Sequence, residues 1–355
     1  MKEMLDLYSD YLISQTGLAT ATGLSSVLEN EISHDQVTRF LNKSKLSSKE
    51  LWEYVKPDVR RLERSSAEGV IILDDTIEEK PHTKENAIIC WHYSHAKGVH
   101  VKGVNILSCL IRHDDISYPI GFEIIHKSEK YFCEKENKEK RRSKITKNEH
   151  FRNLIKQARK NNVQFKYVLA DNWFGAKDNF EFLQEIDKYF IIGIKSNRTI
   201  ALTEEDKLSG RFKKISQLDI KDNFATKVYL KGIDFPVNLI KKVFMNENGS
   251  TGTLYLISND LTKDADHLYS IYQKRWNIEE FHKSIKQNSS LTKSPTKVVR
   301  SQANHIFASI IGFCKLQALK IKTATNHFAL KYKLILKANQ AALKELFRLK
   351  NLASA

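Results

Sequence analysis

Long hydrophobic runs are missing from this sequence of 355 residues. No stretch of about 18 apolar residues exists, so we expect no helix that spans a membrane. The first residues, MKEMLDLYSDYLISQ, contain acidic side chains and no apolar core segment follows them, so we expect no secretory signal. Internal repeats and low-complexity segments are missing as well. The sequence therefore predicts a globular chain without a membrane partner.

Cysteine is scarce, and its spacing excludes the common structural zinc motifs. The four cysteines, Cys90, Cys109, Cys133 and Cys314, are scattered and form no CxxC pair. Isolated cysteines of this kind are typical of reduced thiols in a cytosolic protein. We therefore expect neither a disulfide framework nor a zinc ribbon.

Basic residues are abundant, in contrast to these absences. Lysine and arginine number 58 against 42 aspartate and glutamate residues, which leaves a formal net charge of +16. Such a charge favours a polyanionic partner, and nucleic acid is the usual one. The alternative is a basic protein without such a role. A hydrophobic content of 41% suffices for a core, and the length favours two or three structural units.

The first 67 residues have helical patterns and lack the alternation of strands. Two helices separated by a short polar break are expected within residues 17–41, and Ser33 is placed to cap the second of them. Gln36, Arg39 and Phe40 would then lie in that second helix. The pair is either a helix-turn-helix for DNA or a helical cap on the next domain.

From residue 69 onward, strand patterns dominate. The segment GVIILDDT is followed by three further apolar segments, and KYVLAD and FIIGIK alternate with amphipathic helices. This order predicts a mixed α/β sheet with flanking helices. Residues 196–261 alternate in hydrophobicity around a turn at 246–250, which indicates a β-rich insertion.

The segment between residues 127 and 148 is dense in charge and poor in apolar residues, so we expect a mobile loop. Its Lys140, Arg141, Arg142 and Lys144 are candidates for contacts with phosphates. A loop that is only solvated is the alternative.

One long helix is predicted over residues 263–288, and it carries a polar stripe. Tyr272, Arg275, Glu279 and Lys286 fall within one sector of about 60° on a helix with 100° per residue. Leu268 and Trp276 would border the stripe, and the apolar face lies on the far side. The stripe is therefore either the wall of a cleft or an ordinary solvated face with an Arg275–Glu279 ion pair.

Two further carboxylates could meet this stripe, since Asp74 and Asp171 each end a predicted strand. Acids at strand ends lie at the rim of a sheet, where sites are often built. Three acids that converge repel one another unless a proton or a cation lies between them, and ligands with oxygen alone favour Mg²⁺ or Mn²⁺. Two such ions can promote phosphoryl transfer. With the positive net charge, this pattern predicts a nuclease-type site.

The stripe also matches the Y-x2-R-x3-E-x6-K motif, and the chain thereby resembles the DDE transposases of bacterial insertion sequences, in the branch numbered four. Tyr272, Arg275, Glu279 and Lys286 fill its positions. The segments ILDDT, VLADNWF and IIGIKSNR resemble the family's strand motifs, with the catalytic acids at Asp74 and Asp171. The resemblance covers about residues 70–320.

The resemblance implies a ribonuclease-H-like fold in which Asp74, Asp171 and Glu279 hold two Mg²⁺ ions, with Mn²⁺ as a substitute. It implies that Tyr272, Arg275 and Lys286 contact the phosphates of the transposon end. The expected reaction is cleavage at terminal inverted repeats followed by transfer of the 3′ end into target DNA. A homodimer would hold the paired ends, in a prokaryotic cytoplasm and close to the nucleoid.

These expectations divide the chain into a helical DNA-binding region, a split catalytic domain, the insertion and a helical tail. The DNA-binding region covers residues 1–67, and the catalytic domain is split into 68–195 and 262–325. The insertion covers residues 196–261 and the tail covers 326–355. Trp276 and Trp173 are added as candidate DNA contacts, and for Trp173 core packing is the favoured interpretation over stacking on a base.

In two pairs of adjacent acidic residues, Asp74–Asp75 and Glu279–Glu280, we expect only one member to lie in the site. Asp75 follows Asp74 on the strand and should point to the opposite face, so we expect only Asp74 in the site. Glu280 lies 100° from the stripe on an ideal helix, which favours Glu279. His92, His95 and His100 offer a weak zinc alternative that lacks a complete ligand set, and packing or contact with DNA is the other interpretation.

Two other functions remain open. The first is a catalytically silent DNA-binding protein or repressor derived from a transposase. The second is a cellular nuclease with the same fold that performs no strand transfer.

Overall fold

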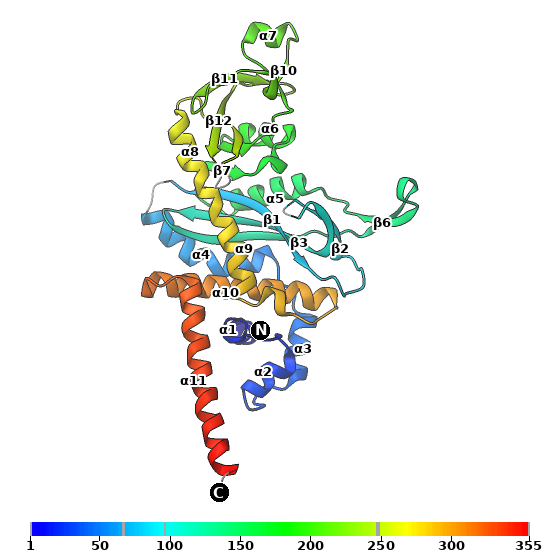
Figure 1. Ribbon diagram of the computed structural model, residues 1–355, viewed down its shortest axis with the longest axis vertical. Helices are drawn as coiled ribbons and strands as arrows, with labels where there is room; N and C mark the ends of the chain where they lie inside the picture. The colour runs from blue at the N-terminus through cyan, green and yellow to red at the C-terminus, as the bar shows by residue number, and fades with distance from the viewer. Residues whose placement is uncertain (1, 66–67, 96, 246–248, 354–355) are drawn as a thin grey trace.

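A mixed sheet of 11 strands runs through the computed structural model, which describes residues 2–65, 68–95, 97–245 and 249–353 (Figure 1). Its centre is built by five strands: β1 (Val70–Glu79), β3 (Val99–His113), β4 (Ile116–Ile124), β7 (Tyr167–Ala170) and β8 (Tyr189–Gly193). β1 pairs antiparallel with β3 and parallel with β7, β3 pairs antiparallel with β4, and β7 pairs parallel with β8. This order and these directions confirm the ribonuclease-H-like α/β fold.

The central strands are apolar because helices or other chain segments cover both of their faces. Val70 to Leu73 and Tyr167 to Ala170 are buried without alternation, as expected for the interior of a covered parallel pair. β1 pairs with β7 only as far as Leu73 and Ala170. Beyond that point the edge of β1 that faced β7 is left without a neighbouring strand, and the apolar run gives way to carboxylates.

Helices follow the strands in the predicted alternation. Those that pack around the sheet are α4 (Ser48–Ser65), α5 (Lys147–Lys160), α6 (Lys177–Glu185), α8 (Ala265–Gln273), α9 (Asn277–Gln287) and α10 (Val299–Thr323). α8 contacts β8 and α9 contacts β1, so the two helices cross the sheet in one continuous line (Figure 1). The expected single helix over 263–288 is interrupted, because a 3₁₀ turn, η4 (Lys274–Trp276), joins α8 to α9.

The insertion before α8 adds strands to the same sheet. It contains β9 (Thr199–Ala201), α7 (Glu204–Leu208), β10 (Lys213–Lys214), β11 (Ala225–Leu230), β12 (Val237–Met245) and β13 (Thr251–Ser258). β13 pairs antiparallel with β8, which makes the insertion a continuation of the central sheet. The β-rich prediction is confirmed, while residues 246–248 of the predicted turn lie outside the described residues.

At the N-terminus, α1 (Lys2–Ser14), α2 (Ala21–Val27) and α3 (His34–Lys43) pack beneath α10. The Ser33 side chain caps α3 in a reciprocal box with Gln36, as predicted. The buried side chains of these three helices form a small core that includes Ala308 of α10. The side chains of α4, by contrast, belong to the main core under the sheet. The DNA-binding role of residues 1–67 stays a prediction.

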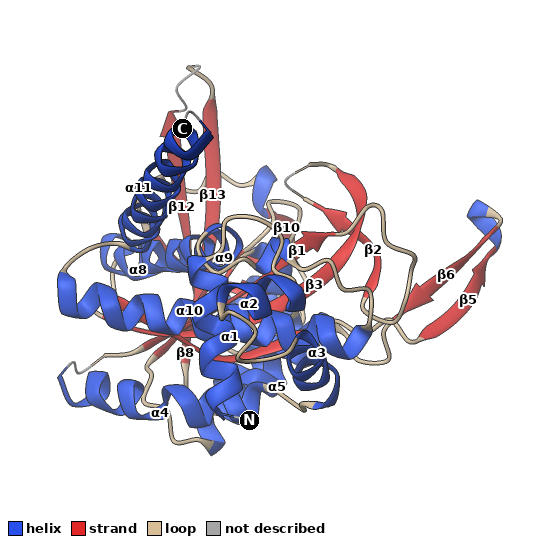
Figure 2. Cartoon of the chain, turned by 90° about the horizontal axis from the view of Figure 1, so that it is seen from below, coloured by secondary structure: helices blue, strands red, loops and turns tan. Residues whose placement is uncertain are grey.

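The prediction of a loop over residues 127–148 is wrong, because much of this segment forms a hairpin. Its strands are β5 (Glu129–Cys133) and β6 (Lys138–Arg142), and Figures 1 and 2 show them projecting from the body of the molecule. Glu129 and Arg142 face each other across the hairpin, with Arg142 Nε 2.9 Å from Glu129 Oε2. Lys130 reaches diagonally to Glu139, with Nζ 2.8 Å from Oε1. Such cross-strand pairs favour strands where apolar residues are few.

Two elements complete the architecture. β2 (Ile89–Ser94) pairs with the first part of β3, next to the segment that pairs with β4. The helical tail is confirmed as α11 (His327–Ala353), which extends away from the other elements (Figure 1). Among the described residues, no helix combines the length and the apolar character needed to cross a bilayer.

Candidate active site

Asp74 and Asp171 come together at the rim of the sheet. The parallel register pairs Leu73 with Ala170, and the residue after each of them is one of the two acids. Asp171 directly follows β7 as predicted, but the prediction that Asp74 ends its strand is wrong, because β1 continues to Glu79 and only its pairing with β7 stops there. Burial, followed by the negative charges of Asp171 and Asp75, raises the pKa of Asp74 to about 7. Burial also raises the pKa of Asp171, against a hydrogen bond from the Trp173 backbone N–H to Asp171 Oδ1 at 3.0 Å. The two carboxylates are thus held close, and the positive charge of Arg275 offsets the rise of their pKa values only in part.

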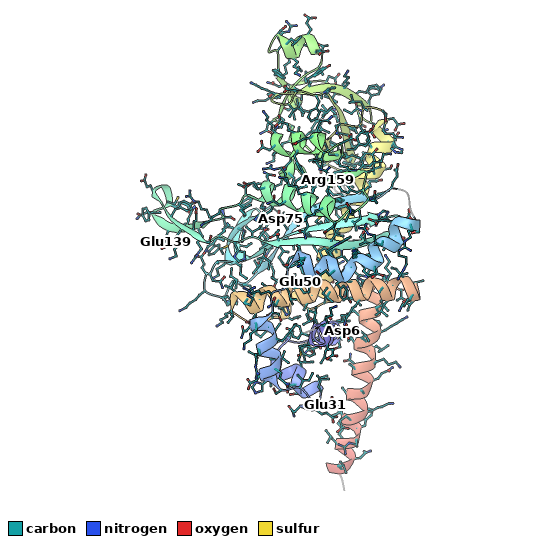
Figure 3. All side chains as sticks on the ribbon, turned by 180° about the vertical axis from the view of Figure 1, so that it is seen from behind. Asp6, Glu31, Glu50, Asp75, Glu139 and Arg159 are labelled. Atoms are coloured by element: carbon teal, nitrogen blue, oxygen red, sulfur yellow. The ribbon has the colours of Figure 1, made fainter. Side chains whose placement is uncertain are left out.

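Asp75 lies at the same cavity as Asp74, contrary to the expectation that only one of them could. Both border a cavity of about 320 Å³, together with Asp171. Figure 3 shows Asp75 in the body of the molecule. Strand alternation alone would separate the two side chains, but the edge of β1 has no partner strand after Leu73. The cavity therefore opens around the strand and reaches both.

Partners on other elements hold the Asp75 carboxylate in place. Asn105 of β3 donates a hydrogen bond to Asp75 Oδ2, and Lys147 Nζ donates to Asp75 Oδ1 at 2.9 Å. Lys147 begins α5, directly after the capping residue Thr146. The sequence analysis missed Lys147, although the Thr146-x-x-Glu149 capping box marks the start of that helix.

Glu279 does not join the two aspartates in this structure. Arg275 Nη2 donates to Glu279 Oε1 at 2.7 Å, and Glu279 is not among the residues that border the cavity. Within the described ranges, no three His, Cys, Asp or Glu side chains are grouped closely enough to hold a metal ion. Asp74 and Asp171 suit a divalent cation, because burial, together with neighbouring carboxylates, disfavours their negative charges, and such a cation would neutralise those charges. Glu279 would have to leave Arg275 to reach it.

The other stripe residues take three different environments. Lys286 borders the cavity and donates to Thr76 Oγ1 at 2.7 Å and to the Ile77 carbonyl at 3.1 Å, which ties α9 to the end of β1. Burial lowers the pKa of Lys286, and Glu78 opposes that shift. Arg275 lies close enough to stabilise the charges of both Asp74 and Asp171.

Tyr272 is buried, with Arg275 5.7 Å from its ring centroid, and burial raises the pKa of Tyr272 to about 12. The expectation that Leu268 and Trp276 both border a cleft is wrong for Leu268. Leu268 is fully buried in the main core, whereas Trp276 is 61% exposed in the η4 turn. The 3₁₀ turn changes the angular positions that an unbroken α-helix would impose.

The prediction that Trp173 packs in the core is also wrong, because its side chain is 41% exposed. It belongs to η2 (Asn172–Phe174), and its ring lies 4.5 Å from Lys147 Nζ and 5.5 Å from the ring of His95. A contact of Trp173 with DNA stays a prediction.

We call the cavity bordered by Asp74, Asp75 and Asp171 the acid cavity. The three basic candidates on β6 lie outside it, on the projecting hairpin. Figure 3 marks this hairpin by its residue Glu139. Lys140 is paired with Glu136, Arg142 with Glu129, and Arg141 Nη1 donates to the Lys127 carbonyl at 3.4 Å. Two of the three charges are therefore already compensated within the hairpin, and their contacts with DNA stay predictions.

The three histidines that suggested a zinc site lie in different environments. His92 is buried, its Nε2 lies 3.4 Å from Cys90 Sγ, and burial lowers the pKa of His92 to about 3. His95 and His100 instead pack edge-on against the ring of Tyr93, which sequence reasoning did not single out.

The chain was compared with known proteins. Residues 1–211 match the family model described as DDE superfamily endonuclease, and residues 139–312 match the transposase DDE domain. No curated protein matches. The solved Drosophila P element transposase strand transfer complex shares 8% identity, over 96% of this chain and 85% of that chain, but its TM-score of 0.28 is too low to support any conclusion.

DDE endonucleases generally use divalent metal ions, which agrees with the chemistry of the two aspartates. The transposase DDE domain spans the segment from the projecting hairpin into α10, and it supports a DDE transposase. Since the first family model covers more than half of its residues, this chain belongs to the DDE superfamily of endonucleases.

Proposed function

We propose that this protein is the transposase of a bacterial insertion sequence. It binds the terminal inverted repeats of that element, cuts the DNA in a metal-dependent reaction and transfers the freed 3′ end into target DNA. The observation that carries the proposal is the meeting of Asp74 and Asp171 at the sheet rim, with both pKa values raised. The net charge of +16 supports a DNA partner.

Asp74 and Asp171 would hold Mg²⁺, or Mn²⁺ in its place, and Glu279 would complete the set. A divalent cation held there would supply positive charge to the phosphate and lower the pKa of the attacking oxygen. Lys286, held by Thr76 and the Ile77 carbonyl, keeps positive charge at the cavity where a phosphate of the cut strand would bind. The buried ring of Tyr272 supports the Arg275 guanidinium from one side.

Arg275 links DNA binding to the third acid. A guanidinium binds phosphate with paired hydrogen bonds, so a DNA phosphate competes with Glu279 for Arg275. When the phosphate takes Arg275, the Glu279 carboxylate is released towards Asp74 and Asp171. The complete acid set then forms only with DNA in place. Two protomers would bring the two ends of the element together, in the cytoplasm of a prokaryotic cell.

The decisive experiment uses a labelled duplex that carries the inverted repeat flanking the gene. Cleavage is followed with Mg²⁺, Mn²⁺ or EDTA for the parent, Glu279→Gln and Glu280→Gln proteins. Glu280 is the matched control, because it neighbours Glu279 on α9 but is exposed and lies away from the acid cavity. We expect metal-dependent nicking at the repeat boundary that Glu279→Gln abolishes and Glu280→Gln retains. Equal cutting by all three proteins would refute the assignment.

The position of Glu279 gives one observation in favour of a second function. With its carboxylate bound to Arg275 at 2.7 Å, the acid set is incomplete, as a catalytically silent DNA-binding protein would allow. Such a protein shifts the repeat duplex in a gel and cuts it with neither metal. A cellular nuclease would cut without producing joined strands, so the appearance of joined products separates it from a transposase.

A further inference from the structure

Four aromatic and imidazole rings form a continuous cluster next to the two aspartates. Tyr93 of β2 lies at its centre, with ring centroids 4.9 Å from His95 and 5.3 Å from His100. His95 continues the row to Trp173, at 5.5 Å. We call Tyr93, His95, His100 and Trp173 the ring cluster. Its members come from β2, the turn after it, β3 and η2, so only the tertiary fold brings them together.

The ring cluster is exposed, unlike aromatic pairs of the main core such as Phe180 and Phe190, whose rings are buried. Tyr93 is 47% exposed and Trp173 is 41% exposed, and both histidines are exposed as well. Large rings that contact each other at the surface leave apolar faces in water, which costs free energy unless a ligand covers them. Core packing therefore does not account for this arrangement.

The location of the cluster connects it with the acids. Tyr93, His95 and Trp173 border the same cavity of about 320 Å³ as Asp74 and Asp171. The backbone N–H of Trp173 also donates to Asp171 Oδ1 at 3.0 Å. A strand with a phosphate in this cavity would thus pass the rings with its adjoining nucleotides.

Lys147 fixes the orientation of the indole and adds positive charge. Its Nζ lies 4.5 Å from the centre of the Trp173 ring and 2.9 Å from Asp75 Oδ1, so the ammonium group is held between the two side chains. Lys286 borders the same cavity. A cavity that contains both aromatic rings and lysines suits single-stranded nucleic acid, because bases stack on the rings and the lysines bind phosphates.

We propose that the ring cluster binds unpaired bases of the DNA strand that enters the acid cavity. Bases within an intact duplex are covered on both faces by their neighbours, so the rings select a strand whose bases near the cut have left the stack. The inference deepens the proposed function and rests on it, since it names the form of the DNA substrate at the same cavity. Tyr93 and Trp173 provide the largest ring faces.

The test measures binding in EDTA, so that no cleavage occurs. The probes are a fluorescein-labelled thymidine dodecamer and a dodecamer of abasic residues that has the same phosphates but no bases. We expect Trp173→Ala and Tyr93→Ala each to weaken thymidine binding by about fivefold to a hundredfold. Binding of the abasic strand should change less than about twofold. Trp173→Phe, which keeps a ring, should retain most of the affinity.

A matched control lies in the insertion. Phe224 is 52% exposed and Lys221 Nζ lies 5.3 Å from its ring centroid, but it is outside the cavity. Phe224→Ala should leave the affinity for both strands unchanged. Losses that are equal for the thymidine and abasic strands, or no loss for thymidine in the Trp173→Ala and Tyr93→Ala proteins, would overturn the proposal.

A second measurement needs no variant and so avoids any effect on folding. A thymidine dodecamer with one 2-aminopurine is titrated with the unmodified protein, and stacking on the rings should quench the fluorescence of that base. Binding without quenching at any position of the 2-aminopurine contradicts the proposal. Because neither experiment uses cleavage, these outcomes are independent of whether Glu279→Gln abolishes cutting.

Discussion

The strand side and the helix side of the candidate site are built in different ways. The strand side consists of Asp74 and Asp171, whose neighbouring positions follow from the register of two parallel strands in the buried sheet. The helix side consists of Arg275, Glu279 and Lys286, carried by η4 and α9. There the Arg275–Glu279 ion pair is only partly exposed, at 15% for Arg275 and 37% for Glu279, and it competes with the convergence of the three acids.

This difference indicates which half of the site is formed before DNA arrives. Backbone pairing holds the aspartates together despite their mutual repulsion, because separating them would cost the hydrogen bonds of the ladder. A partly exposed ion pair contributes about 0–1 kcal/mol, so a DNA phosphate can displace it. We therefore expect the strand side to be preformed and Glu279 on the helix side to move when DNA binds.

The largest expected effect comes from the strand side. Asp171→Asn should reduce metal-dependent cleavage of the repeat duplex by at least about a hundredfold, because one of two adjacent ligands is lost. Gel analysis of the labelled duplex measures this, with Asp178→Asn as a control. Asp178 lies in the first turn of α6, outside the acid cavity. A decrease below tenfold would contradict a role for Asp171 as a metal ligand.

Glu279→Gln should separate the two sides. Without DNA, calorimetric titration with Mn²⁺ should give affinities for Glu279→Gln and for the parent that agree within about twofold, because Glu279 is bound to Arg275. Asp74→Asn in the same titration should weaken binding by at least about tenfold. With uncleavable repeat DNA present, Glu279→Gln should weaken Mn²⁺ binding too. Strong weakening by Glu279→Gln in the absence of DNA would show that the helix side is preformed as well.

Arg275→Gln should produce a smaller change of the opposite sign. It frees Glu279, so Mn²⁺ affinity without DNA should rise about two- to fivefold, in line with the energy of a partly exposed ion pair. Affinity for the repeat duplex should fall, and its dependence on salt should weaken by about one phosphate contact. Reduced Mn²⁺ affinity in this variant would mean that Arg275 positions the aspartates and does not restrain Glu279.

The smallest effect is a dependence of stability on pH in EDTA. Because burial, followed by the charge of Asp171, raises the pKa of Asp74 to about 7, the folded protein binds a proton more tightly than the unfolded chain. Its free energy of unfolding should therefore fall as pH rises from about 4 to about 7. Asp74→Asn should flatten this slope and stabilise the protein at pH 8 by roughly 1–2 kcal/mol, after allowance for solvent screening.

Urea unfolding at several pH values measures that slope, with Glu280→Gln as the control. Parallel pH profiles for Asp74→Asn and the parent would mean that water reaches the Asp74 carboxylate and relieves its repulsion. They would also remove the argument that the strand side needs a cation.

Local patterns in the sequence predicted the fold and brought Asp74 and Asp171 to one region of the sheet. They did not predict that β1 continues past Asp74 or that Asp75 borders the same cavity. An apolar run that ends in a carboxylate occurs in both ILDDT and VLAD, and buried strands with short connections leave few alternative arrangements. The capping of α3 by Ser33 and the helical tail were predictable for the same reason, since both depend on neighbours within a few residues. The charged hairpin was not, because its stability comes from pairs between opposite strands.

The sequence by itself determined which positions hold acidic, basic and aromatic side chains, and on which elements they lie. Only the tertiary structure decided which of them meet. The end of the β1–β7 pairing admits Asp75 to the cavity, α5 brings Lys147 to it, and β2 and η2 bring Tyr93 and Trp173 into one row. These contacts join residues far apart in the chain, and their geometry depends on where strands end and side chains turn. No local periodicity contains that information, because periodicity describes one element at a time.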